Sequence, residues 1–99
     1  MDIITNHKLF EEHSKIIFDT LNERLRQNNK FGANRTQHPF LWNTILVEEV
    51  GEAAKESLDM YFSDHPKEAV EKYRKELIEV AAVAIAAIQD LDDNGIFKS

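Results

Sequence analysis

Apolar residues recur every three or four positions along three long segments of the chain. The first segment runs from about Asn6 to Gln27, and its periodic apolar residues are Phe10, Ile17, Phe18, Leu21 and Leu25. This spacing places them on one face of an α-helix. The stretch 28–38 that follows is rich in Asn and contains Gly32, as is typical of a loop.

A second helix is predicted from Pro39 to about Phe62. Proline is favoured in a first helical turn, because the N–H that it lacks would have no partner there. The apolar positions of this helix are Trp42, Ile45, Leu46, Val50, Ala53 and Leu58. The short segment 63–66 then forms a connection, in which we expect Asp64 to cap the next helix.

A third helix is predicted from about Pro66 to Leu91. Its apolar face consists of Val70, Tyr73, Leu77, Val80, Ala84, Ile88 and Leu91. From 80 to 88 the helix is apolar almost all round, which is typical of a buried helix. Three helices cannot easily surround it, so its remaining face is expected to meet another subunit. With no strand-like alternation, the pattern predicts an all-α fold: one domain, 1–99, a helical bundle of about three long helices completed by a homo-oligomer, either a dimer or a tetramer.

Composition narrows the choice of partners. The 99 residues include 12 basic and 18 acidic side chains, for a net charge of −6. This balance disfavours nucleic acid and anionic membranes, because binding to these requires an excess of Lys and Arg. The apolar run 80–88 is too short to span a membrane, and the amphipathic start is unlike a signal peptide. No cysteine is present, so thiolate metal sites are excluded and a cytoplasmic protein is expected.

Glutamates continue the apolar stripes of the second and third helices. Glu49, Glu52 and Glu56 are spaced by three and four residues, so they share the side of the second helix that carries its core residues. Glu76 and Glu79 repeat the pattern on the third helix. Two antiparallel helices would bring these acids to one centre, where a hard cation such as Mg²⁺ would relieve their mutual repulsion.

Two other interpretations of these acids were weighed. The glutamates could form a solvated acidic face, with Lys72 and Lys75 paired to Glu76 and Glu79 one turn later. A bundle di-iron site requires Glu-x-x-His on its helices. No glutamate of this chain has histidine three residues later, so that site is excluded.

The runs 45–52 (ILVEEVGE) and 76–84 (ELIEVAAVA) resemble those of the MazG-like all-α nucleoside triphosphate pyrophosphohydrolases. That superfamily carries Glu-x-x-Glu on one helix and Glu-x-x-Asp on the next. The approach 30–39, followed by Trp42, also looks like the segment that precedes the motif in short members. Here Glu79 stands where the family has Asp.

The resemblance implies a function and a set of site residues. It implies hydrolysis of (deoxy)nucleoside triphosphates between the α and β phosphates, with Mg²⁺ or Mn²⁺ as cofactor. The implied metal ligands are Glu49, Glu52, Glu76 and Glu79. A general base would be Glu48 or Glu56. Glu56 is the better placed on an ideal helix, whereas the family's doubled Glu-Glu favours Glu48.

The expected substrate contacts are Lys30, Arg35, His38, Trp42 and Asn94, together with Lys98. For Trp42 the competing interpretation is core packing, and for Arg35 and His38 it is an exposed loop. The run 90–95 resembles the opening of a calcium loop, but a helix end with Gly95 just beyond it is favoured. The alternative functions are a non-catalytic module that binds nucleotide or metal, or has a regulatory role, and a purely structural helical dimer.

Overall fold

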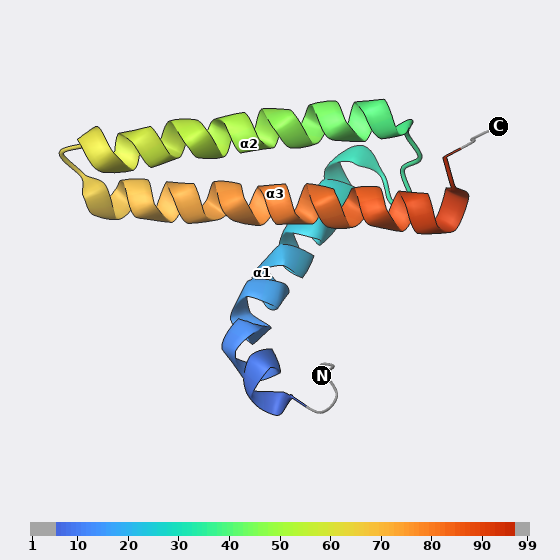
Figure 1. The fold of residues 1–99 in the computed structure, drawn as a ribbon, viewed down its shortest axis with the longest axis horizontal. Coiled ribbons are helices and arrows are strands. Elements are labelled where there is room, and N and C mark those ends of the chain that lie inside the picture. Colours follow the sequence, from blue (N-terminus) through green and yellow to red (C-terminus); the bar gives the residue numbers. More distant parts are fainter. Residues whose placement is uncertain (1–5, 97–99) are drawn as a thin grey trace.

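The computed structural model describes residues 6–96, which form three α-helices. They are α1 (His7–Phe31), α2 (Pro39–Phe62) and α3 (Pro66–Asn94). Helices α2 and α3 lie side by side and antiparallel, while α1 packs on α3 and its amino-terminal half extends away from the pair (Figure 1). No strand occurs in residues 6–96. The predicted all-α architecture of three long helices is confirmed.

The helix ends depart from the predicted ones at three places. Helix α1 continues to Phe31, where Gly32 ends it with a φ of 94°. Helix α3 continues to Asn94 and is ended by Gly95, with a φ of 70°. Both positive φ angles lie in the region that suits glycine, so the glycines, rather than the polar residues before them, stop the helices. The third departure is the N-cap of α3, which is His65 and not Asp64.

The core lies between α2 and α3. Trp42, Val83 and Ala86 are buried together, and the half-buried side chains of Ile45, Leu46 and Ala87 pack against them. None of the larger side chains in residues 6–96 is completely buried. A core this small is consistent with a bundle that is completed by an oligomer.

The predicted apolar face of α1 is not covered by other residues of the described range 6–96. Its members are all exposed, namely Phe10, Ile17, Phe18, Leu21 and Leu25. Only Thr20 is buried among the residues of α1. Polar contacts tie α1 to α3: Arg74 pairs with Asp19 at 2.8 Å, and Arg24 donates to Gln89 at 3.2 Å. Helix α1 thus presents an apolar stripe outward.

The buried face of α3 differs from the predicted one. Val70, Leu77, Ile88 and Leu91 are exposed. The residues buried instead are Ala69, Ala82, Val83, Ala86 and Asp90. Most of these are alanines, and small side chains let neighbouring helices approach α3 closely, so the larger apolar residues are left on the far side.

None of the helices in residues 6–96 has the length and apolar character that a membrane span requires.

Candidate metal centre and adjoining cavities

Three glutamates from two helices converge beside the core. Glu49 comes from α2, and Glu76 and Glu79 come from successive turns of α3. One carboxylate oxygen of each lies within 4.8 Å of the others, and all three residues are half-buried. We call these residues the glutamate trio. Oxygens at this spacing can share one divalent cation, because Mg²⁺ and Ca²⁺ take carboxylate ligands.

Glu52, the fourth predicted ligand, does not join the trio. Its side chain is exposed, and it is not part of the group whose oxygens converge. Its charge nevertheless contributes to raising the pKa values of Glu49 and Glu76. Glu52 therefore lies near the trio without belonging to it.

Burial and mutual repulsion disfavour the ionised form of the trio's carboxyl groups and raise the pKa values of Glu49 and Glu76. Removal from water is the main reason that the pKa of Glu76 is raised to about 7, and hydrogen bonding to Glu79 and the charges of Glu79, Glu49 and Glu52 account for the rest of this rise. Burial also raises the pKa of Glu49, and Glu79 again adds to the effect. Oxygen Oε2 of Glu76 is buried without a hydrogen-bond partner within residues 6–96. An unpartnered oxygen among repelling carboxylates fits a cation-binding site.

The alternative prediction was that Lys72 and Lys75 form ion pairs with Glu76 and Glu79 on α3, and these pairs do not form within residues 6–96. Within residues 6–96, neither Lys72 nor Lys75 forms a salt bridge with Glu76 or Glu79. Lys75 instead contributes to lowering the pKa of Glu23 on α1. The trio therefore has no lysine from its own helix to balance it.

Helix α1 supplies a charged wall that sequence reasoning missed. Nε of Arg26 donates to Glu23 at 2.8 Å. This hydrogen bond is the main reason that the pKa of Glu23 is lowered, and it raises the pKa of Arg26, to which the charges of Glu79 and Glu49 also contribute. The Arg26 guanidinium is thus held within electrostatic reach of the trio. Only the (i, i+3) spacing of Glu23 and Arg26 could have signalled the pair.

A cavity of about 310 Å³ opens beside the trio. We call it the acidic cavity, because Glu48, Glu49 and Glu79 line it. Its opposite wall carries basic residues from α1 and the following loop, namely Arg26, Lys30 and Arg35. The structure therefore brings the predicted contacts Lys30 and Arg35 next to the carboxylates.

The two predicted general bases are separated. Glu48 is exposed and lines the acidic cavity together with Glu49 and Glu79. Glu56 lines a different hollow, near the α2–α3 connection, with His65. Since helical residues rise about 1.5 Å each, Glu56 lies roughly 10 Å along α2 from Glu49. The structure thus places Glu48 beside the trio and Glu56 away from it.

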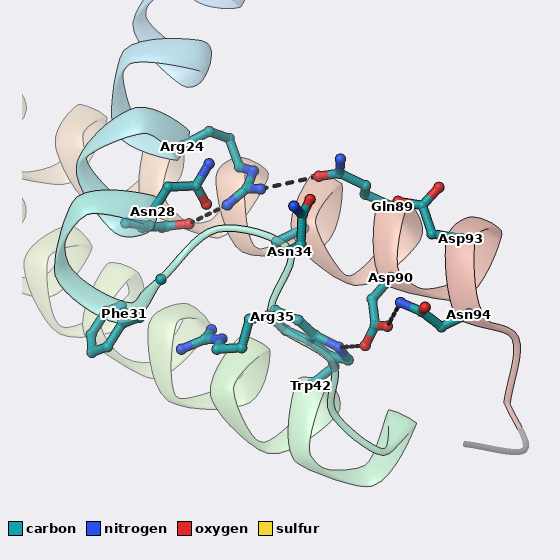
Figure 2. A pocket seen from close by; sticks show the side chains of 13 residues that line it. Arg24, Asn28, Phe31, Asn34, Arg35, Trp42, Gln89, Asp90, Asp93 and Asn94 are labelled. Carbon is teal, nitrogen blue, oxygen red and sulfur yellow. Dashed lines mark hydrogen bonds between the residues drawn. The ribbon is translucent and has the colours of Figure 1, made fainter. Parts of the chain in front are cut away.

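A second cavity, of about 220 Å³, adjoins the acidic cavity at the end of α3. Figure 2 shows its lining, which includes Arg24, Arg35, Trp42, Asp90, Asp93 and Asn94. We call it the loop cavity, because the α1–α2 loop forms one side. Gln27, Phe31 and Arg35 line both cavities. The two spaces therefore share a wall.

Trp42 is a core residue and only part of its ring system faces the loop cavity. It is 5% exposed, and the Arg35 guanidinium lies over the ring at 4.9 Å from the centroid. The indole N–H donates to Oδ2 of Asp90 at 2.7 Å. Asn94 donates to Oδ1 of the same carboxylate at 2.9 Å. The competing prediction of core packing for Trp42 is confirmed, and Asp90 emerges as a site-building residue that was not predicted.

Two further predicted contacts lie elsewhere. His38 is exposed and caps α2, with Nδ1 accepting from the backbone N–H of Phe40 at 3.2 Å. Its side chain lines neither the acidic cavity nor the loop cavity. Lys98 lies outside the described residues.

Comparisons of this chain with protein-family models, with curated proteins and with solved structures found no match. What stands on the residues alone is a three-helix all-α protein with an acidic cluster that could hold a metal ion. A cavity lined by acidic and basic side chains lies beside that cluster, and a second cavity adjoins the first.

Proposed function

We propose that this protein is a cytoplasmic, Mg²⁺-dependent (deoxy)nucleoside triphosphate pyrophosphohydrolase, which releases a nucleoside monophosphate and pyrophosphate. The observation that carries the proposal is that two members of the glutamate trio, Glu49 and Glu79, line one cavity together with the basic side chains of Arg26, Lys30 and Arg35. Carboxylates that bind Mg²⁺ beside cationic side chains suit a polyphosphate chain. The resemblance of the two glutamate motifs to the MazG-like enzymes supports the same assignment.

Each side of the acidic cavity has a separate task in this scheme. Glu49, Glu76 and Glu79 hold the metal ion. Bound there, Mg²⁺ would neutralise phosphate oxygens and lower the pKa of a coordinated water. Lys30 and Arg35 lie opposite and offer N–H donors to the remaining phosphate oxygens. Arg26, anchored by Glu23, adds positive charge on the same wall.

Glu48 is the proposed general base. Its carboxylate lines the acidic cavity, is exposed, and belongs to the turn that carries Glu49. It accepts a proton from the attacking water as the new bond from the water oxygen to the α phosphorus forms. The bond from the α phosphorus to the α–β bridging oxygen breaks. Pyrophosphate leaves with that oxygen, and the nucleoside monophosphate keeps the oxygen from water.

The deciding experiment is incubation with each of the common NTPs and dNTPs plus Mg²⁺, with separation of the products by ion exchange. The expected products are a monophosphate and pyrophosphate, and in ¹⁸O-labelled water the label enters the monophosphate. Formation of a diphosphate and orthophosphate would contradict cleavage between the α and β phosphates. Turnover of no nucleotide would contradict the enzymatic assignment.

Matched variants connect the activity to the site. Glu49→Gln keeps the size of the side chain but removes its charge, and we expect it to abolish Mg²⁺-dependent turnover. Glu48→Gln should reduce the rate by about 10²-fold or more while leaving metal binding intact, since general bases contribute on the order of 10²–10⁴-fold. Glu11→Gln, an exposed change on α1, is the control and should retain full activity.

A non-catalytic module that binds nucleotide or metal is the second candidate. Two observations favour it: Glu52 lies outside the converging group, and Glu79 has a longer side chain than the family's Asp. A displacement of about 1 Å at a reacting centre can cost about 10²-fold in rate. Nucleotide-dependent thermal stabilisation without any product would favour this candidate over the hydrolase.

We also propose that a second copy of the chain covers the exposed stripe of α1, giving a dimer or a tetramer. Phe18, Leu21 and Leu25 are 65%, 56% and 59% exposed and follow one another at helical spacing. Contiguous apolar surface of this kind marks association sites in soluble proteins. Helix α1 also carries Arg26 and Lys30. Association through this helix would therefore fix the basic wall of the acidic cavity.

A further inference from the structure

The loop cavity is a second space that the proposed phosphate chemistry leaves unused. We propose that it binds the nucleoside half of the substrate and selects bases that carry both a carbonyl oxygen and an exocyclic amino group, as cytosine and guanine do. This inference rests on the proposed function and assigns its substrate class.

The position of the cavity suits a ligand whose phosphates occupy the acidic cavity. Gln27, Phe31 and Arg35 line both spaces, so the two cavities lie next to each other at these residues. Cavities that enclose drug-sized ligands measure roughly 300–1,000 Å³. The loop cavity, at about 220 Å³, suits a smaller group such as a base with its sugar.

One wall of the loop cavity offers hydrogen-bond donors. Arg24 donates to Gln89 at 3.2 Å and reaches Gln27 at 3.5 Å, which leaves further N–H groups of its five without a partner. Within residues 6–96, no carboxylate forms a salt bridge with Arg24 or Arg35. Figure 2 shows both guanidinium groups on the side formed by α1 and the loop. Guanidinium groups recognise carbonyl oxygens of bases.

The α3 wall offers hydrogen-bond acceptors. Both oxygens of Asp90 are engaged, Oδ2 by Trp42 and by the backbone N–H of Gln37, and Oδ1 by Asn94. Asp93 is the other carboxylate of the lining, and no residue in 6–96 donates a hydrogen bond to it. A base amino group is a donor that this carboxylate can accept.

The two walls together define the preferred base. Cytosine and guanine each carry a carbonyl oxygen for the guanidinium of Arg24, the arginine that lines the loop cavity alone, and an amino group for Asp93. Adenine has no carbonyl oxygen, and uracil and thymine have no amino group. A base that lacks one of these groups forms one hydrogen bond fewer to a charged side chain, which is expected to lower its affinity by about tenfold.

Phe31 supplies a surface for stacking. Its ring is 52% exposed, and it lines both cavities. The guanidinium of Arg35 and the ammonium group of Lys30 lie over this ring, 5.0 Å and 5.1 Å from its centroid, so a base that stacks here must displace one of them. Bases stack readily on such rings whatever their identity, so stacking would add affinity while the polar walls set the preference.

Trp42 provides a probe inside the cavity. It is the single tryptophan of the chain, so a ¹⁵N–¹H spectrum contains one indole N–H resonance. We would follow this resonance while titrating CMP, GMP, AMP and UMP without any divalent cation. CMP and GMP are expected to shift it, with dissociation constants at least about tenfold lower than those of AMP and UMP. Equal affinity for all four, or no shift with any of them, would overturn the proposal.

Two consecutive aspartates near the end of α3 give a matched pair of variants. Asp93→Asn replaces the proposed acceptor and is expected to reduce the ratio of CMP to UMP affinity towards one. Asp92→Asn is the control, because both aspartates line a further hollow but only Asp93 lines the loop cavity, and the ratio of CMP to UMP affinity in this variant should stay that of the wild type. A ratio that is unchanged in Asp93→Asn would contradict the role of this carboxylate. Circular dichroism would verify that both variants remain helical.

The titration is independent of the acidic cluster. Monophosphate binding in the absence of metal reports on the loop cavity, whereas pyrophosphate release reports on the glutamate trio. Turnover with no preference for cytosine or guanine would overturn the inference and leave the proposed function standing. Selective binding of CMP and GMP without turnover of any triphosphate would support the base preference of the loop cavity and contradict the proposed hydrolase activity.

Discussion

The indole N–H of Trp42 donates to Asp90 at 2.7 Å and thereby joins the first turns of α2 to the last turns of α3. Both residues are nearly buried, at 5% and 3% exposure. The same carboxylate accepts the backbone N–H of Gln37 at 2.8 Å. Asp90 therefore also holds the α1–α2 loop, in which Arg35 projects between the two cavities.

Removing this carboxylate should destabilise the protein and release the loop. Asp90→Ala deletes the acceptor shared by Trp42, Gln37 and Asn94, and we expect a loss of about 2–4 kcal/mol in the free energy of unfolding, since hydrogen bonds to charged groups are worth roughly 1.5–3 kcal/mol each and are not additive. Urea unfolding monitored by circular dichroism measures the loss. Asp92→Ala, an exposed change on the same helix, is the control. A loss under about 0.5 kcal/mol for Asp90→Ala would show that the network contributes little.

Divalent cations should stabilise the folded protein through three glutamates rather than four. Ligand binding to the native state alone raises the melting temperature. We therefore expect Mg²⁺ and Mn²⁺ to raise the melting temperature of the wild type. Glu79→Gln, within the trio, should lose this effect, whereas Glu52→Gln should keep most of it, because Glu52 is exposed outside the trio. Thermal shift with and without EDTA tests both variants. Equal loss in the two variants would place Glu52 among the ligands.

The sequence predicted the helices well where strong stop signals exist. The bounds of α2 match because Pro39 begins it and the polar connection before Pro66 ends it. The end of α1 at Gln27 and the bound of α3 at Leu91 were predicted too early, because asparagine and aspartate are only weak helix breakers, whereas the expectation that Gly95 lies just beyond a helix end is confirmed. In both cases the helix continues until a glycine with positive φ.

The candidate site was predictable only as far as helical periodicity reaches. Periodicity placed Glu49, Glu76 and Glu79 on inward faces, and the structure brings them together. It could not fix the offset between two antiparallel helices, on which the exposure of Glu52 depends. Periodicity also does not give the angle at which α1 crosses α3. The position of Arg26 beside Glu49 and Glu79 could therefore not be predicted.

The raised pKa of Glu76 predicts how stability depends on pH in the absence of metal. The pKa is about 7 in the folded protein against an ordinary value of 4.5. Above about pH 7 the folded state must hold an ionised Glu76, which costs stability, and this cost disappears as the pH falls through 7 towards 4.5. Glu76→Gln should therefore be more stable than the wild type at about pH 8 in EDTA, and the advantage should fade near pH 5.

Urea unfolding at the two pH values would measure this difference. Glu71→Gln, an exposed change on the same helix, provides the control and should show no such pH-dependent advantage. If Glu76→Gln were only as stable as the wild type at the higher pH, the inferred cost of ionising Glu76 in the folded protein would be wrong. Adding Mg²⁺ should reverse the order, because only the wild type retains the full set of ligands.

The exposed stripe of α1 predicts that the protein associates and that one charge disrupts the association. Phe18 is 65% exposed near the middle of the stripe. Phe18→Asp would place an ionised carboxylate in the interface, where its desolvation is costly. We expect light scattering after size exclusion to give a dimer or tetramer for the wild type and a monomer for this variant. Asn43→Asp adds the same charge to an exposed position of α2, outside this stripe, and should leave the assembly intact. A monomeric wild type, or an assembly that survives Phe18→Asp, would contradict an interface on this face.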